Sequence, residues 1–151
     1  MKNIYSNIYS FNKKILRKTV NYLKQGNIAG LPTETVYGVG GNAYSKRAIK
    51  KIFKLKKRPN NNPLIIHYYS IKNVQKDVIL NNNFLKLYKK FCPGPLTFVL
   101  KKNKKTRIDS LATAKLNTVA IRFPKHKVVR KLLKLIDLSL IHISEPTRRI
   151  L

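Results

Sequence analysis

The chain has 151 residues, 43% of them hydrophobic, and a formal net charge of +28. Its length predicts one domain with a buried core, and its apolar content excludes a disordered or fibrous protein. The longest apolar runs fall well short of the roughly 20 residues that a membrane-spanning helix needs. Residues 1–6 lack the apolar segment of a secretory signal, and the single Cys92 excludes a disulfide framework or a cysteine-rich zinc site. We therefore expect a cytoplasmic protein.

Helix and strand signals alternate in the N-terminal half. Apolar residues at helical spacing predict a helix over residues 11–23, and the apolar run 28–31 predicts a short buried strand. A second helix is expected to begin after Ser45, a favourable N-cap residue, and to end before Pro59. Residues 64–67 then predict another apolar strand.

The C-terminal half continues the alternation. We expect a short helix after Ser70, a longer one over residues 84–91 and a last one over residues 128–133. Strands are expected over residues 96–100 and 118–123, joined by a solvated lysine-rich loop. The pattern predicts an α/β fold with a twisted, mostly open sheet. It contains neither a P-loop nor a dinucleotide fingerprint, so a nucleotide site would be of another kind.

The most informative segment is residues 30–38, which read GLPTETVYG. Two hydroxyls, a carboxylate and a phenol follow the end of a predicted strand. Polar side chains in such a loop are typical of a small-molecule site in an α/β protein. The alternative is a plain connection in which Thr33 or Thr35 caps a helix.

Five segments occur in the same order as in a known enzyme family. They read PTETVYG at 32–38, KKRP at 56–59, NPLIIH at 62–67, PGPLT at 93–97 and TVAIRFP at 118–124. Together they resemble the YrdC-type threonylcarbamoyl-AMP synthases, over roughly residues 12–138. The resemblance implies a YrdC-like twisted, open, mixed sheet flanked by helices.

The resemblance also implies a reaction. The family's enzymes are nucleotidyltransferases that join L-threonine, bicarbonate and ATP into L-threonylcarbamoyladenylate, with release of pyrophosphate, for threonylcarbamoyladenosine modification of tRNA. Mg²⁺ is expected with the ATP, carried on its phosphates because the sequence shows no acidic cluster. Proteins of tRNA modification are the partners that the family implies.

By the same resemblance, seven residues are expected to bind the substrates. Those implied for ATP are Lys56, Arg58, Asn62 and Thr118, and those implied for L-threonine are Thr35, His67 and Arg122. If the segment after the second helix is extended, Lys56 and Arg58 point the same way and reach one phosphate chain. Lys56 is one of 25 lysines, most of which are simply solvated.

The residues themselves leave alternatives open. Arg122 ends an apolar strand and needs an anionic partner, which is either a substrate carboxylate or an acid such as Asp137. His67, by its strand alone, is more typical of a hydrogen-bonded core histidine. No general acid or base is assigned, because Glu34 in its loop is equally typical of a capping residue.

The resemblance ends after Leu138. The synthases carry there a strand and a Ser-x-Asn motif that helps to hold ATP, whereas residues 139–151 read SLIHISEPTRRIL. That string resembles translated sequencing-adapter read-through. We therefore expect an incomplete YrdC-like domain over residues 1–138, a non-native tail over 139–151, and a chain with little or no turnover. The alternative is a divergent member with a genuine tail.

The positive charge supports a second function class, a noncatalytic module that binds double-stranded RNA or tRNA. However, Lys, Asn and Ile are all frequent, at 25, 15 and 16 residues, and RNA binding has no reason to enrich Asn and Ile. Compositional drift is the favoured explanation, with nonspecific, salt-dependent RNA binding expected in either case. A third reading, the carbamoyl-transfer domain of hydrogenase maturation proteins, conflicts with one cysteine and 151 residues.

Overall fold

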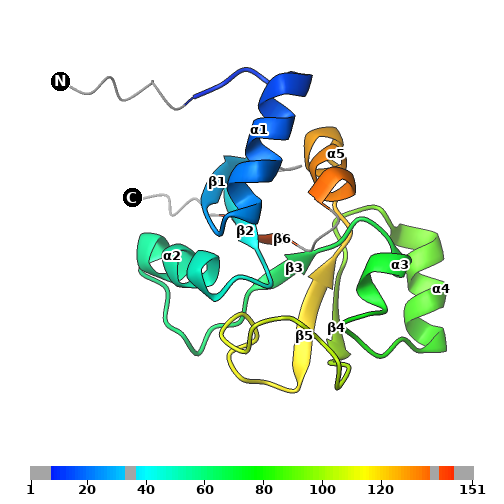
Figure 1. Cartoon of the computed structure of the whole chain (residues 1–151). Helices are drawn as coiled ribbons and strands as arrows, with labels where there is room; N and C mark the ends of the chain where they lie inside the picture. The colour runs from blue at the N-terminus through cyan, green and yellow to red at the C-terminus, as the bar shows by residue number, and fades with distance from the viewer. Residues whose placement is uncertain (1–7, 33–36, 137–139, 145–151) are drawn as a thin grey trace, which may run out of the picture.

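The computed structural model of the chain describes residues 8–32, 37–136 and 140–144 (Figure 1). The helices are α1 (Lys13–Lys24), α2 (Lys46–Lys56), α3 (Ile71–Val74), α4 (Asn82–Phe91) and α5 (Lys127–Ile136). The strands are β1 (Ile28–Leu31), β2 (Gly38–Asn42), β3 (Ile65–His67), β4 (Thr97–Lys101), β5 (Thr118–Arg122) and β6 (Leu140–Ser144).

The six strands form one sheet in the order β1-β2-β6-β3-β5-β4. Strands β3 and β5 are parallel, and the other neighbouring pairs are antiparallel. The expected open, mixed sheet flanked by helices is thus confirmed (Figure 1). Within the described part of the chain, no helix is long and apolar enough to cross a membrane.

Polar side chains begin three of the helices as local chemistry predicts. Asn12, Ser45 and Asn81 each accept a hydrogen bond from the backbone N–H three residues further on, at 2.9, 3.3 and 2.8 Å. Ser70 occupies the N-cap position of α3 but makes no such bond. Helix α2 ends at Lys56, three residues before Pro59.

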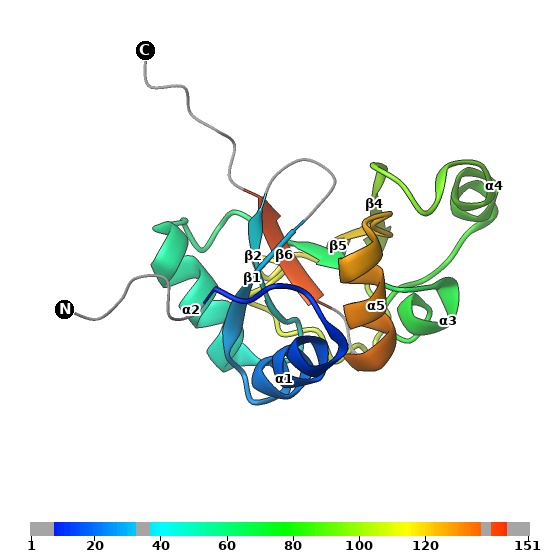
Figure 2. The ribbon, with the colours of Figure 1, turned by 90° about the horizontal axis from the view of Figure 1, so that it is seen from above.

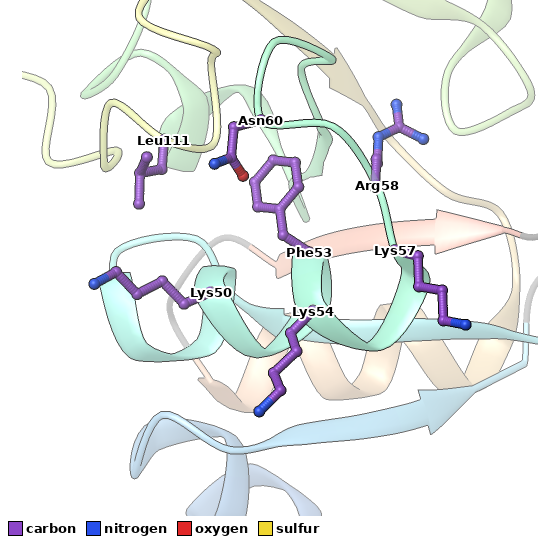
Figure 3. Close-up of a pocket in the computed structure, with 7 residues that line it drawn as sticks. All are labelled: Lys50, Phe53, Lys54, Lys57, Arg58, Asn60 and Leu111. Carbon is purple, nitrogen blue, oxygen red and sulfur yellow. The ribbon is translucent and has the colours of Figure 1, made fainter.

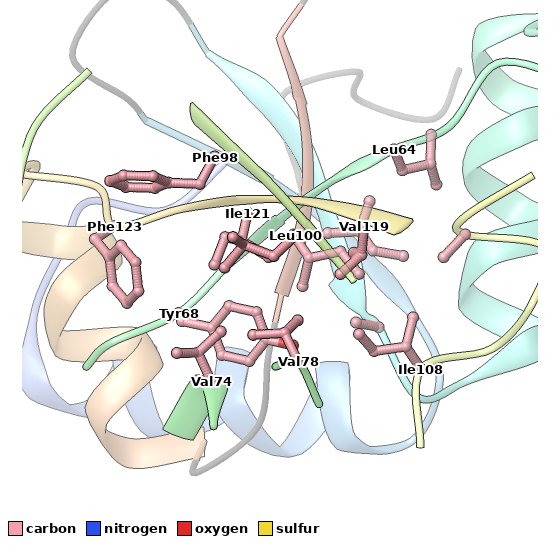
Figure 4. Packing of buried hydrophobic residues seen from close by; sticks show 14 of the residues in the cluster. Leu64, Tyr68, Val74, Val78, Phe98, Leu100, Ile108, Val119, Ile121 and Phe123 are labelled. Atoms are coloured by element: carbon pink, nitrogen blue, oxygen red, sulfur yellow. The ribbon is translucent and has the colours of Figure 1, made fainter. Parts of the chain in front are cut away.

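Two apolar clusters hold the helices on the sheet. The larger cluster joins one face of the sheet to α2, α3 and α4, and it includes Phe53 and Ile66. Phe98 and Ile121 also belong to it and are labelled in Figure 4. The smaller one joins α1 and α5, which lie side by side, to Leu31 of β1 (Figure 2). The two clusters lie on opposite faces of the sheet, because in β1 Ile28 packs against the larger cluster, whereas Ala29 and Leu31, which point the other way, belong to or pack against the smaller one.

Strand β2 was not expected from the sequence. Its segment GVGGN carries few side chains to show an alternating pattern, and neighbouring side chains pack closely against its glycines. A Cβ at Gly40 would lie 2.4 Å from Leu31 Cδ1, and one at Gly41 would lie 3.0 Å from Ile52 Cδ1. The neighbours of β2 thus fill the space in which larger side chains would have shown the alternating pattern that predicts a strand.

Strand β6 was also unexpected, because it lies in the segment after Leu138. It runs between β2 and β3, and its Ile141 is fully buried opposite Gly41 and Ile66. The expected boundary at Leu138 and the non-native origin of residues 139–151 stay predictions. The structure adds that residues 140–144 occupy the middle of the sheet.

Candidate functional site

Strand β5 presents alternate side chains to the two faces of the sheet. Val119 and Ile121 are buried in the larger apolar cluster. Thr118, Ala120 and Arg122 are half-buried and point to the opposite face. The two polar residues therefore lie at the two ends of one strand, on one face, with a small side chain between them.

That face is open beside β5. Helices α1 and α5 cover it at β1, where Leu31 is buried against them. On the edge strand β4, Val99 is paired with Ala120 and shares its face, yet it is 67% exposed. The face formed by β4 and β5 is therefore accessible to a ligand, and we call it the open face.

His67 and Arg122 end the two parallel strands and are direct register partners. Neighbouring strands lie about 4.8 Å apart, so the side chains of these two register partners are neighbours on the same face. His67 is 3% exposed, and Arg122 buries its Nε. Open α/β sheets bind ligands at the carboxyl ends of parallel strands, and the structure brings these two predicted residues together there.

The guanidinium of Arg122 has no hydrogen-bond or ion-pair partner among the described residues. A partly desolvated cation without a counter-ion is unfavourable unless an anion joins it. Asp137, the acid that the sequence offered as an alternative partner, lies outside the described residues. The geometry thus favours a carboxylate or phosphate ligand at this end of the open face.

Arg58 and Asn62 are also brought together, in the loop between α2 and β3. Nη2 of Arg58 donates to Asn62 Oδ1 at 2.8 Å and to the Pro63 carbonyl at 3.1 Å. Nε donates more weakly to the Asn62 carbonyl at 3.4 Å. These contacts orient the guanidinium and leave the two N–H groups of Nη1 for a ligand.

Thr118 lies near the same edge of the sheet as Asn62. Ile65 pairs with Ala120 in the parallel register, and Asn62 and Thr118 precede these two partners by three and two residues. The ATP residues of the prediction thus lie toward the amino ends of β3 and β5. Thr118 and Arg122 are four positions apart in an extended strand, which corresponds to about 13 Å.

Lys56 does not fit the expected arrangement. It is the last residue of α2, and Lys57 after it adopts a left-handed conformation with φ 48° and ψ 37°. The idea that Lys56 and Arg58 point the same way along an extended segment is therefore wrong. Whether Lys56 contacts ATP stays a prediction.

A pocket of about 350 Å³ lies next to Arg58, between α2 and the segments that carry Asn60 and Leu111 (Figure 3). It is lined by Lys50, Phe53, Lys54, Lys57, Arg58, Asn60 and Leu111. In Figure 3, Arg58 and Lys50 lie at opposite ends of this group, with Phe53 and Asn60 between them. The four cations around this pocket will attract anions. Three of the four are exposed lysines.

Thr35 and its neighbours Thr33 and Glu34 lie outside the described residues, so their roles stay predictions. The segment that contains them joins two paired strand ends, Leu31 and Gly38. Across the described ranges, no group of three or more His, Cys, Asp and Glu side chains could hold a metal ion.

The hydrogen-bond network around Asp77, which is 1% exposed, was not predicted from the sequence. Its carboxylate accepts hydrogen bonds from Tyr44 Oη, Tyr68 Oη, Thr106 Oγ1 and the Arg107 backbone N–H. Tyr68 directly follows His67, so the network also anchors the end of β3. The only signal was an aspartate in a chain with five acidic residues.

Comparisons with known proteins place the chain in a family. The family model for Sua5, YciO and YrdC proteins, described as "Telomere recombination", matches residues 21–146. A threonylcarbamoyl-AMP synthase of Pyrococcus abyssi is 40% identical over 138 residues, which are 89% of this chain and 38% of that protein. A putative threonylcarbamoyl-AMP synthase of Methanocaldococcus jannaschii is 32% identical over a match that covers 87% of this chain and 64% of that protein.

A solved structure of P. abyssi Sua5 complexed with L-threonine has a TM-score of 0.83 and 36% identity. The match covers 90% of this chain and 40% of that one. The chain thus spans less than two thirds of the length of these relatives. The family match contains all seven predicted site residues and continues past Leu138 into β6. The chain belongs to the Sua5/YciO/YrdC family.

Proposed function

We propose that the chain makes L-threonylcarbamoyladenylate from L-threonine, bicarbonate and ATP and releases pyrophosphate. The observation that carries the proposal is the pairing of His67 with an unpartnered Arg122 at the carboxyl ends of two parallel strands. The similarity to threonylcarbamoyl-AMP synthases, and to a relative whose structure contains L-threonine, supports it. The product would serve threonylcarbamoyladenosine formation in tRNA, in the cytoplasm and with other tRNA-modification proteins.

Arg122 would bind the carboxylate of L-threonine. A guanidinium donates two parallel hydrogen bonds to a carboxylate, and such charge-assisted bonds are roughly twice as strong as neutral ones. His67, its register partner, would contact the same amino acid. Thr35 would complete this end of the site.

Arg58, Asn62 and Thr118 would bind ATP at the other end of the open face, with Lys56 as an additional cation. The hydrogen bonds from Arg58 to Asn62 and Pro63 hold the guanidinium in place before a nucleotide arrives. The separation of about 13 Å between Thr118 and Arg122 suits a ligand in which an amino acid and a nucleotide are joined.

The reaction would proceed in two steps. The amine of threonine attacks bicarbonate, and a carbamate forms with loss of water. A carbamate oxygen then attacks the α-phosphorus of ATP, the bond from that phosphorus to the bridging oxygen breaks, and pyrophosphate leaves with the electron pair. Fixed cations stabilise the charge that develops on the phosphates.

Mg²⁺ would supply further charge neutralisation on the phosphates. The described residues offer no cluster of acids for it. We therefore propose that it enters with ATP rather than on protein ligands, and we assign no step to it.

The test is pyrophosphate release measured with all three substrates and with each one omitted. Any release should need the complete set. Arg122→Ala should abolish this release and L-threonine binding, whereas Arg17→Ala, which removes an exposed cation from α1, should change neither. Because little or no turnover is expected of this chain, binding of L-threonine and of ATP is measured as well, and a folded chain that binds neither would show that the proposed function is wrong.

A second candidate is noncatalytic RNA binding. The charge of +28 and the exposed lysines around the pocket beside Arg58 favour it. Binding of unrelated RNA duplexes without any pyrophosphate release would support this candidate over the first.

A further inference from the structure

Thr97 lies beside the two residues proposed to bind L-threonine. It is the first residue of β4 and the register partner of Arg122, which in turn pairs with His67 on the other side. Directly paired residues share a face of the sheet, with Cβ atoms about 4.5–5.5 Å apart. Thr97, Arg122 and His67 therefore form a row across three strands, with the guanidinium in the middle.

The hydroxyl of Thr97 is available to a ligand. The side chain is half-buried, and it makes no hydrogen bond to any part of the chain that the structure describes. The next residue, Phe98, points to the opposite face, where its ring lies 4.8 Å from that of Phe84 in an edge-on contact. The strand therefore cannot rotate to hide the hydroxyl without removing Phe98 from the core.

The backbone before Thr97 is also held in place. The N–H of Gly94 donates to the carbonyl of Phe123 at 2.8 Å, which ties the start of β4 to the end of β5. A Cβ at Gly94 would lie 2.4 Å from the carbonyl oxygen of Phe91, so only glycine fits there without a backbone shift. The positions of Thr97 and Arg122 relative to each other are thus set before any ligand binds, as a binding site requires.

A carboxylate has two oxygens and about four lone-pair sites, more than one guanidinium uses. We propose that the Thr97 hydroxyl donates a hydrogen bond to the substrate carboxylate beside Arg122. Thr97 is then a further residue of the amino-acid site, and this role rests on the proposed function. In the plain alternative, Thr97 is only a β-branched residue that suits a strand.

The test compares Thr97→Val, which keeps the branched shape without the hydroxyl, with Thr97→Ser, which keeps the hydroxyl. Binding of L-threonine and of ATP is measured separately by calorimetry, after thermal melts have shown that each variant folds. We expect Thr97→Val to weaken L-threonine binding about 10- to 100-fold, the range for a hydrogen bond to a charged group. Thr97→Ser should stay within about threefold, with ATP affinity unchanged in both.

Thr19→Val in α1 is the matched control, because the Thr19 hydroxyl donates a hydrogen bond to the carbonyl of Ile15 on its own helix and to no other group that the structure describes. If Thr97→Val fails to fold, the serine and alanine variants make the same comparison, since they differ by one oxygen atom. L-threonine binding within twofold in Thr97→Val, together with its loss in Arg122→Ala, would overturn the role of Thr97 alone. Absence of L-threonine binding in the unchanged chain would overturn the proposed function as well.

Discussion

Removing the carboxylate of Asp77 is expected to destabilise the fold strongly. Asp77 is 1% exposed, and it collects hydrogen bonds from four donors on three separate parts of the chain. Tyr44 follows β2, Tyr68 follows β3, and Thr106 and Arg107 belong to the loop between β4 and β5. The perturbation is Asp77→Ala, which leaves all four donors without this acceptor.

The expected loss follows from the burial of the donors. Tyr68 is 1% exposed, so its hydroxyl cannot turn to water, and stranding a buried donor costs about 1–3 kcal/mol. Tyr44 and Thr106 are half-buried and Arg107 is exposed, so water can replace part of their bonds. Together we expect about 3–5 kcal/mol, a large share of a typical stability of about 5–15 kcal/mol.

The assay is thermal and urea unfolding of Asp77→Ala beside Asp109→Ala. Asp109 is a half-buried aspartate whose carboxylate accepts one backbone N–H, from Leu111 at 2.9 Å. For a chain of this size, about 3–5 kcal/mol corresponds to a fall in Tm of roughly 10–15 °C, and Asp109→Ala should lose about 1 kcal/mol. If the two variants melt within about 3 °C of each other, the argument that the network joins three parts of the fold is wrong.

Four further outcomes are expected. Arg58→Ala should weaken ATP binding about 10- to 100-fold. Lys86→Ala, which removes an exposed cation from α4, should change ATP binding little. Equal losses of ATP affinity in the two variants, measured by calorimetry, would contradict the assignment of Arg58 to the ATP site. Ile141→Ala should lower the free energy of unfolding by about 2–5 kcal/mol, because Ile141 is 0% exposed. The control Ile79→Ala should lower it by well under 1 kcal/mol, because Ile79 is 56% exposed. An unchanged free energy of unfolding in Ile141→Ala would mean that β6 is not the central strand. Affinity for unrelated RNA duplexes should fall steeply and alike as salt rises, given the charge of +28, and preference for one RNA that survives high salt would refute this. Burial raises the pKa of the Cys92 thiol, so less thiolate is present at pH 8 and iodoacetamide should react with it more slowly than with free cysteine; an equal or faster rate would contradict it.

The position of Lys101, at the nucleotide end of the site, could not be predicted from the sequence alone. Lys101 directly follows the strand expected over residues 96–100, so the sequence predicts it in the solvated lysine-rich loop. The structure places it at the end of β4 as the register partner of Thr118, on the same face. It is therefore beside the proposed ATP residues, which is why Lys86 on α4, and not Lys101, serves as the control for Arg58→Ala.

The elements built from local signals were determined by the sequence itself. Apolar spacing indicated α1, α2, α4 and α5, polar caps indicated where helices begin, and short apolar runs indicated β1, β3, β4 and β5. These signals lie within a few residues of one another, so they need no knowledge of the fold. The five ordered motifs likewise lie in the sequence, and they identified the family before any geometry was known.

Only the tertiary structure decided what depends on distant partners. Strand β2 is made of glycines whose neighbours Leu31 and Ile52 fill the missing side-chain space, and β6 exists by pairing with β2 and β3. His67 and Arg122 lie 55 residues apart in the chain and become neighbours only through the parallel register of β3 and β5. Hydrogen bonding between strands joins residues without regard to their separation in sequence, so the composition of this row of side chains could not be read from local pattern.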